Sequence, residues 1–368
     1  MKHDYKFYGW QISYFAGKAR GYIKYKGVDF EEKEINIFDL RKIAKATKRA
    51  AMPAIESKEG EWFCDTPLIM EEFEKRHPTP AVLTNTPVHT FVAELLQNWF
   101  DDSWIVIALH TRWSYNENWE TRNREGGGKT LLPFAPKFIR NMIVEKIFKQ
   151  NMVQHLPNQG IVPESIPLLE KWSLTLLDLL ELHFTQHGYL LGERPTVADF
   201  ALFGPMFGHL NRDPWPKREW IDSRPNLQRW VEKMARGDQT SKELYPNDEI
   251  PPTLMPIVKI VFNEFLPLMQ NTAEEIKQMV TDKGLESGRA LPRTTENLTF
   301  NMLDGTYCRG SFTYSVWRIQ RLQNMVKNFS EQDKEVLKSW LDEQGQQDFL
   351  AIDYGHKLKR KGLVAALA

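Results

Sequence analysis

Short strand-like and helix-like segments alternate through the first 80 residues, and this alternation limits the fold more than any other feature of the sequence. The segments follow the order βαβαββα, with strands at 5–8, 28–36, 51–57 and 61–64 and helices at 17–26, 39–48 and 65–78. Strands that alternate with helices are typical of an α/β fold. Residues 1–80 are therefore predicted to form a small α/β domain.

After residue 88 the pattern becomes helical only. Two long stretches carry apolar residues at helical spacing, "FVAELLQNWFDDSWIVIALH" and "ESIPLLEKWSLTLLDLLELHF". Between them, residues 116–136 are polar and include Gly126 to Gly128, so a long flexible loop is expected there. We predict an all-helical domain for residues 88–240.

The composition changes again at "DQTSKELYPNDEIPP", which reads as a linker. Residues 251–368 follow as a C-terminal extension, in which we expect a helix at 254–279, a strand pair near 297–312 and two further helices. The predicted fold class is α+β overall, with an α/β N-terminal domain, an all-helical C-terminal domain and a mixed α/β extension.

The charge balance and the cysteine count exclude several classes of protein. Lys+Arg and Asp+Glu both total 48, so no global field favours nucleic acid or an anionic membrane. No stretch is apolar enough for a membrane span, and we expect a cytoplasmic protein with no nucleic-acid partner. The two cysteines cannot form a disulfide framework. His183 and His187 share a helix face but have no third ligand, so no metal site is predicted.

The stretch "FYGWQISYFAGKARGYIKYKG", residues 7–27, places Ser13 and Tyr14 at a turn from strand to helix. The free N–H groups and the positive dipole end of a helix start stabilise an anion nearby. The turn is therefore a candidate anion site, and the residues alone leave the identity of the anion open.

Three further stretches carry a family resemblance. The chain contains "MPAI", then "DTPLI" at a helix start, then "GERPTVADFALFGPMF" followed by "RPNLQRWVEKM". Together they resemble the glutathione S-transferase superfamily over about residues 4–237. The resemblance implies a thioredoxin-like N-terminal domain and an all-helical second domain. It also implies that glutathione is the co-substrate and that the protein is a homodimer.

The resemblance assigns a glutathione site. Pro53 matches the family's cis-proline, which leaves the backbone of Met52 exposed to pair with an extended peptide such as glutathione. Asp65 and Thr66 match the acidic-or-amide residue and the hydroxyl residue that hold the γ-glutamyl end. The alternative is that Asp65 and Thr66 only cap a helix.

The resemblance leaves three candidates for activation of the glutathione thiol. Ser13 matches the position before the first helix where many family members carry a Ser or Cys that hydrogen-bonds the sulfur. Tyr8, at the end of the first strand, instead fits the tyrosine-type members, and Tyr14 is adjacent to Ser13. With any of the three, the stabilised anion is a thiolate. All three side chains also have the alternative of simply packing in the fold.

An apolar pocket for a hydrophobic electrophile is expected beside this turn, because the family builds it there and on the first long helix of the second domain. In this chain those regions supply Trp10, Phe15, Trp104, His110 and Trp113. The motif "TVADFA" has a different role, since Thr196 and Asp199 have the spacing of a capping box that supports folding.

The resemblance thus implies a glutathione transferase that acts in detoxification. Glutathione-dependent dehalogenation, isomerisation or reduction is a related alternative. A non-catalytic module for protein interaction is the alternative from another class, with the extension as its working part. The extension after residue 250 could cover the pocket, form an oligomer contact or bind a partner.

Overall fold

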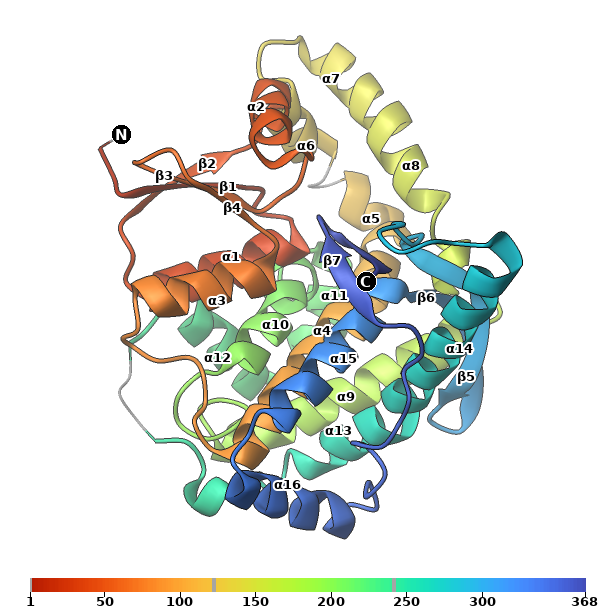
Figure 1. The fold of residues 1–368 in the computed structure, drawn as a ribbon. Helices are drawn as coiled ribbons and strands as arrows, with labels where there is room; N and C mark the ends of the chain where they lie inside the picture. The colour runs from red at the N-terminus through yellow and green to blue at the C-terminus, as the bar shows by residue number, and fades with distance from the viewer. Residues whose placement is uncertain (1, 121–123, 240–242) are drawn as a thin grey trace. The chain divides into compact units, whose positions relative to one another are not determined.

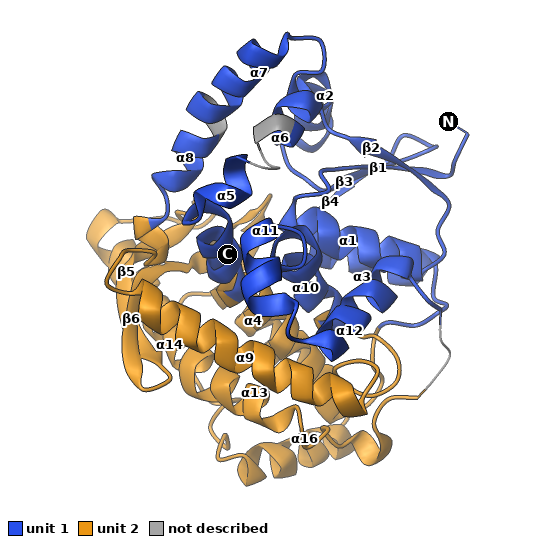
Figure 2. Cartoon of the chain, turned by 180° about the vertical axis from the view of Figure 1, so that it is seen from behind, with its two compact units in different colours: residues 1–82, 104–156, 199–242 blue, residues 83–103, 157–198, 243–368 orange. Residues whose placement is uncertain are grey.

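The computed structural model describes residues 2–120, 124–239 and 243–368 (Figure 1). Contacts divide the chain into two compact units (Figure 2). Unit 1 contains residues 1–82, 104–156 and 199–242, and unit 2 contains residues 83–103, 157–198 and 243–368. Because the units interleave along the sequence, the helices α4 (Pro87–Trp113) and α10 (Val197–Pro205) contribute residues to both.

Unit 1 contains a four-stranded sheet in the order β2-β1-β3-β4. Its strands are β1 (Tyr5–Gly9), β2 (Phe30–Glu34), β3 (Ala54–Ser57) and β4 (Trp62–Cys64). β2 is parallel to β1, whereas β3 pairs antiparallel with both β1 and β4. This arrangement confirms the thioredoxin-like α/β domain, with β2 and β4 at the two edges of the sheet.

Three helices belong to this sheet, namely α1 (Tyr14–Tyr25), α2 (Ile37–Thr47) and α3 (Thr66–Arg76). Figure 1 shows α1 and α3 on one face of the sheet and α2 on the other. The helix predicted at 17–26 begins earlier, because the Ser13 hydroxyl accepts a hydrogen bond from the Ala16 N–H and so starts α1 at Tyr14. Asn36 and Asp39 form a capping box at the start of α2.

The rest of unit 1 is helical. It contains α5 (Asn116–Asn118), α6 (Arg124–Leu131), α7 (Lys137–Ile143), α8 (Gln150–Val153), α11 (Pro214–Pro216), α12 (Pro225–Arg236) and the π-helical segments η2 (Val144–Lys149), η4 (Met206–Leu210) and η5 (Lys217–Ile221). Thr196 and Asp199, at the start of α10, are fully buried, and their capping box stays a prediction.

The flexible loop predicted at 116–136 is wrong over α6, where Gly126 to Gly128 are helical. A Cβ on Gly128 would lie 3.2 Å from the Cβ of Arg140, and one on Gly127 would lie 3.8 Å from Val144. Gly128 therefore lets α6 pack closely on α7, whereas a Cβ on Gly127 would make only an ordinary contact and one on Gly126 would meet nothing within 4 Å. Residues 121–123 of the expected loop lie outside the described residues.

Unit 2 combines long helices with two small hairpins. Its helices are the first part of α4, α9 (Ile166–Gln186), α13 (Met255–Ile260), α14 (Leu266–Lys283), α15 (Thr313–Lys327), α16 (Glu331–Glu343), the 3₁₀ turns η3 (Pro157–Gln159) and η6 (Pro246–Asp248), and the π-helical segment η7 (Val261–Phe265). The strands are β5 (Thr294–Met302), β6 (Gly305–Phe312), β7 (Leu358–Lys361) and β8 (Val364–Leu367).

The extension matches its predicted elements and adds one more. A helical run covers residues 255–283, and β5 pairs antiparallel with β6 where the strand pair was expected. The hairpin of β7 and β8 was not predicted. In β7 only Leu358 is buried, so the strand keeps its basic side chains exposed. Residues 251–368 lie in the same compact unit as α9.

Candidate active site

The turn between β1 and α1 presents Ser13 at the first position of a helix. Ser13 has extended backbone angles, φ −90° and ψ 131°, and its Oγ accepts a hydrogen bond from Ala16 N at 3.3 Å. Its side chain is half-buried. A hydroxyl that accepts from the backbone still has its own proton to donate. Ser13 can therefore cap α1 and donate to an anion in the same arrangement.

Ser13 opens onto a cavity of about 190 Å³ within unit 1. The cavity is lined by Trp10, Ile12, Ser13, Met52, Leu109, Arg112, Trp113, Trp119, Gly127, Leu131, Val144, Met152 and His209. Most of these side chains are apolar or aromatic, and the polar ones are Ser13, Arg112 and His209. An apolar cavity with few polar groups is typical of a site for a small organic ligand.

Met52 lies in this cavity, directly before the proline that the resemblance assigned to the glutathione site. The bond between Met52 and Pro53 is cis, as the resemblance implies. Met52 is half-buried and Pro53 is buried. The structure thus brings Met52 and Ser13 to the same cavity, although 38 residues of sequence lie between them.

Asp65 precedes the first residue of α3 and has an unusual backbone conformation, with φ 77° and ψ 111°. This region is unfavourable for a residue with a side chain and tends to be kept at functional sites. The Asp65 side chain makes no capping hydrogen bond. The first hydrogen bond of the helix is Ile69 N to Asp65 O at 2.9 Å, so the N–H groups of Thr66 and Leu68 have no acceptor within the helix. The geometry does not support the alternative that Asp65 only caps α3.

Arg112, near the end of α4, connects three segments of unit 1. Its guanidinium donates to the backbone oxygen of Ile12 at 2.6 Å and to Asp213 at 2.8 and 3.1 Å. It also donates to the backbone oxygen of Gly208 at 2.5 Å. Arg112 and Asp213 are both buried. Because Ile12 is adjacent to Ser13, this buried ion pair holds the turn that carries the serine.

His209 is the third polar residue of the cavity lining. Its Nδ1 lies 3.0 Å from the backbone oxygen of Ala108, and its Nε2 lies 3.3 Å from Arg112 Nη1. Burial, and the charge of Arg112 after it, hold the pKa of His209 well below its ordinary value. A neutral ring that donates from Nδ1 and accepts at Nε2 satisfies both contacts.

Tyr8 lies outside the cavity lining and already has partners for its hydroxyl. It donates to Glu56 Oε2 at 2.8 Å and accepts from Lys42 Nζ at 3.1 Å. Burial, and the hydrogen bond to Glu56 after it, raise the pKa of Tyr8 well above its ordinary value. This hydroxyl is poorly suited to stabilise a thiolate, because its proton is committed to a carboxylate.

The other predicted site residues divide into two groups. Trp10 and Trp113 line the cavity, whereas Tyr14, Phe15, Trp104 and His110 are not part of its lining. Tyr14 is buried and packs on Gly204, where a Cβ would lie 3.0 Å from its backbone oxygen. Trp104 is fully buried, and His110 is buried with Nδ1 2.9 Å from Ser114 Oγ. The ring of Phe15 contacts that of Tyr14, with centroids 4.8 Å apart.

Sequence reasoning missed Arg112 and His209. They lie 97 positions apart, and no local motif joins them. Arg112 could have been found from its position next to Trp113, a residue that the resemblance placed in the pocket. Trp119 was also missed, because it falls in the segment expected to be a loop.

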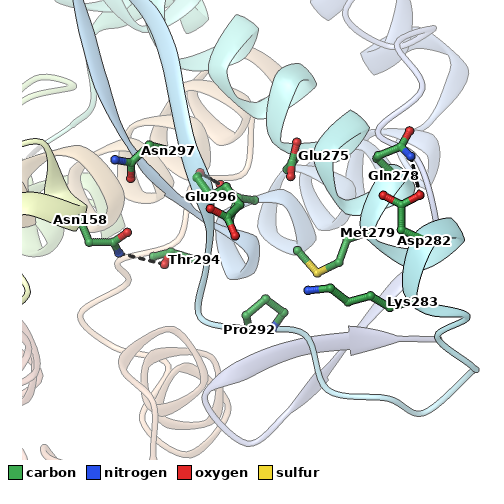
Figure 3. Close-up of a pocket in the computed structure, with 11 residues that line it drawn as sticks. Asn158, Glu275, Gln278, Met279, Asp282, Lys283, Pro292, Thr294, Glu296 and Asn297 are labelled. Atoms are coloured by element: carbon green, nitrogen blue, oxygen red, sulfur yellow. Dashed lines mark hydrogen bonds between the residues drawn. The ribbon is translucent and has the colours of Figure 1, made fainter.

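A second hollow of about 570 Å³ lies in unit 2, between α14 and β5 (Figure 3). Its polar lining includes Glu275, Asp282, Lys283 and Glu296. Most of its lining residues are exposed, and some bond one another, as Gln278 does to Asp282 at 2.7 Å. These features are typical of a solvated surface groove.

Among residues 2–120, 124–239 and 243–368, no group of three or more His, Cys, Asp or Glu side chains is arranged to hold a metal ion. No helix in the described part of the chain is both long and apolar enough to cross a membrane.

The fold and the site together define a thioredoxin-like domain with a cis-proline, followed by helices. Residues 7–81 match the family described as glutathione S-transferase, N-terminal domain, and residues 174–233 match glutathione S-transferase, C-terminal domain. Over these two segments the chain is similar to the glutathione S-transferase superfamily.

Individual relatives are distant. A glutathione S-transferase of Arabidopsis thaliana is 31% identical over 106 residues, which cover 28% of this chain and 37% of that protein. The match therefore spans little more than a third of the curated relative.

Several solved structures are similar at low identity. A β-etherase from Sphingobium sp. strain SYK-6 has a TM-score of 0.42 and 15% identity, covering 70% of this chain and 99% of its own. A GST-like protein from Pseudomonas syringae has a TM-score of 0.41 and 15% identity, covering 84% and 96%. A glutathione S-transferase from Methylobacterium radiotolerans, in complex with glutathione sulfonate, has a TM-score of 0.38 and 17% identity, covering 67% and 99%. The similarity to the family rests on the two domain matches and on the sheet described above.

Proposed function

We propose that this protein is a glutathione transferase that activates the thiol of glutathione at Ser13 for attack on a hydrophobic electrophile. The observation that carries the proposal is that Ser13, at the start of α1, and Met52, before the cis-proline, line one apolar cavity. A thiol-binding hydroxyl, a peptide-binding backbone and an apolar pocket are the parts that such a reaction needs.

Glutathione would lie along the edge formed by Met52 and the start of α3. The backbone of Met52 would pair with the peptide, since an extended ligand adds to a free backbone edge. The N–H groups of the first turn of α3 would take the γ-glutamyl carboxylate, and Asp65 would take its ammonium group. The unusual backbone conformation of Asp65 supports this role.

Ser13 would donate a hydrogen bond to the sulfur and so favour the thiolate over the thiol. The dipole of α1 adds favourable potential at the same point. The thiolate then attacks an electrophilic carbon, the new carbon–sulfur bond forms, and the leaving group departs with the electrons of the bond that breaks. Ser13 itself forms no covalent bond in this reaction.

The second substrate would be a small hydrophobic molecule. The cavity volume of about 190 Å³ leaves room for a compact group such as one aromatic ring. Trp10, Trp113 and Trp119 provide flat apolar surface for such a ring. By resemblance to the family, we also propose that the protein is a cytoplasmic homodimer with a role in detoxification. Light scattering tests the dimer against the monomer mass of 43.1 kDa.

Calorimetry with glutathione tests the proposal, using the parent chain and an Asp65→Ala variant. We expect binding by the parent and an affinity loss of about 1–3 kcal/mol in the variant, because the ligand ammonium would lose its partner. An Asp29→Ala variant is the control, since Asp29 is an exposed carboxylate of the same domain. Conjugation of a chlorodinitrobenzene by the parent tests the chemistry. A parent that binds no glutathione would favour the non-catalytic interaction module.

A further inference from the structure

Large apolar side chains gather on one outer face of unit 1. We call this face the α2/α7 patch and define it by Ile37, Phe38, Phe134, Phe138 and Met142. Phe134 is 81% exposed, Phe138 72%, Met142 60% and Phe38 57%. Half of the exposed large hydrophobic residues among those described belong to this patch. Such a concentration of exposed apolar surface indicates an interaction site.

The patch is continuous between α2 and the segment that leads into α7. The rings of Phe38 and Phe134 have centroids 6.1 Å apart. Phe138 and Met142 follow at a spacing of four residues on α7, so they share one side of that helix. Figures 1 and 2 show α2, α6 and α7 together at the same end of unit 1.

The opposite sides of α2 and α6 are anchored in unit 1. Ile43 of α2 is fully buried in the cluster that holds Tyr8 and Trp10, and Leu131 of α6 packs against the same cluster. Thr130 Oγ1 also donates to Glu34 Oε2 at 2.8 Å. The patch residues of α2 therefore lie on the outer face of a helix whose inner face is already packed, whereas α7 has no buried residue.

The charges around the patch are largely positive. Arg41 and Lys45 follow Phe38 at spacings of three and seven residues on α2, so they lie on the same side of that helix. Both are exposed, and within the described part of the chain neither forms a salt bridge. Lys137 and Lys146 are exposed on the α7 side.

Carboxylates near the patch already have partners. Asp39 is buried and pairs with Lys33 at 2.5 Å. Glu145 accepts a hydrogen bond from Trp119 and pairs with Lys149 at 3.1 Å. The exposed Glu34 bonds Thr130. The chain has no net charge, so this positive surround is a local feature of one face.

We propose that the α2/α7 patch binds the surface of an anionic lipid bilayer. Projecting aromatic and apolar tips enter the boundary between headgroups and acyl chains, and a surround of Lys and Arg pairs with anionic headgroups. The patch supplies both features on one face. Long basic side chains can keep their charges at headgroup level while their stems cover apolar surface. A bilayer can also accept side chains that project from the protein, because it needs no groove of matching shape.

Vesicle co-sedimentation of the full chain tests this proposal. One set of vesicles contains phosphatidylcholine only, and the other also contains phosphatidylserine. We expect binding to the phosphatidylserine vesicles, and weakening as salt is raised. An Arg41→Gln, Lys45→Gln variant should lose about 30-fold in partitioning, since each basic residue contributes about fivefold. A Phe134→Ser, Phe138→Ser variant should lose at least about tenfold at every salt concentration.

A Leu182→Ser, Lys338→Gln variant is the matched control, because it changes an exposed apolar and an exposed basic residue of unit 2. We expect its partitioning to equal that of the parent. Equal binding to both kinds of vesicle, no binding, or equal losses in the control would overturn the proposal. Light scattering adds a further test. If the Phe134→Ser, Phe138→Ser variant halves the mass of a parent dimer, a second copy covers the patch and the proposal is wrong.

Discussion

The guanidinium of Arg112 donates a hydrogen bond to the backbone oxygen of Ile12 at 2.6 Å, so a residue near the end of α4 fixes the turn before Ser13. Asp213 binds the same guanidinium at two points. A guanidinium group that is hydrogen-bonded on both sides cannot rotate freely, and the position of Ile12 is therefore well defined. Arg112 is a positioning residue for the proposed thiolate site.

Arg112→Lys should lower kcat with a model electrophile by about tenfold or more, while KM for glutathione changes little. Lysine keeps the positive charge but cannot make the several hydrogen bonds of a guanidinium group. The Ser13 turn therefore relaxes, while the contacts at Met52 and Asp65 remain. Steady-state kinetics with both substrates varied measures this. Arg212→Lys is the control, because the Arg212 contacts are longer, at 3.3 and 3.4 Å. An unchanged kcat in the Arg112 variant would show that the turn does not depend on this contact.

Asp65→Gly should raise the stability of the protein and weaken its binding of glutathione. Glycine adopts a φ of 77° without steric cost, so the free energy of unfolding should rise by about 1 kcal/mol. Glutathione affinity should fall, because the carboxylate is lost. Lys48→Gly is the matched control, since Lys48 also has a positive φ, 63°, and lies outside the proposed site. Urea unfolding and calorimetry on both variants check this. A gain in stability with full glutathione affinity would exclude Asp65 from the site.

The sequence predicted the order of strands and helices in residues 1–80, the proline before β3 and the start of α3, because these depend on local patterns and on motifs of adjacent residues. The prediction failed where tertiary packing determines the local structure. Three glycines favour a loop, yet residues 126–128 are helical and Gly128 lets α6 approach Arg140. Sequence also failed to show that Arg112 meets Asp213, since the contact joins positions 101 apart.

The candidate site also has some features that local sequence predicted and others that only the fold revealed. Ser13 was correctly placed at the turn from strand to helix, although the helix was predicted to begin at residue 17 and α1 begins at Tyr14. Our proposal of Ser13 rather than Tyr8 rests on the positions of Glu56 and Lys42, which come together through β3 and α2. Aromatic residues on α4 looked alike in the sequence, and only the fold separates Trp113 in the cavity from Trp104 in the core.

His183 should make stability depend on pH. Burial lowers its pKa from 6.5 to about 4, and both ring nitrogens have partners, in Thr253 and Tyr189. Below about pH 6.5 the unfolded chain binds a proton that the folded chain does not. The free energy of unfolding should therefore fall by about 2 kcal/mol from pH 7 to pH 5 through this residue.

Urea unfolding of the parent and a His183→Gln variant at both pH values isolates the contribution of this histidine. The variant should lose less stability than the parent on acidification. His356→Gln is the control, because His356 is exposed. Identical pH dependence in the parent and the His183 variant would show that this histidine is not held neutral in the fold.

Asp102 should be essential for the stability of unit 2. It accepts hydrogen bonds from Arg309 and from Ser315, the latter at 2.6 Å, and both Asp102 and Arg309 are buried. Asp102→Ala leaves a buried guanidinium without its carboxylate, which should cost about 3–5 kcal/mol. Ser315→Ala should cost only about 1 kcal/mol, because it removes one hydrogen bond. Coinciding thermal melts of Asp102→Ala and the parent would contradict this account.

The thiolate absorbance of bound glutathione, measured against pH, tests the central claim most directly. The measurement compares the parent with Ser13→Ala, Tyr8→Phe and Tyr14→Phe. We expect the parent to hold the thiol pKa below the ordinary value of about 8.5, and Ser13→Ala to raise it by about one unit or more. The two tyrosine variants should titrate like the parent, since neither hydroxyl belongs to a residue that lines the cavity. A shift in a tyrosine variant alone, or a parent that does not lower the thiol pKa, would contradict activation by Ser13.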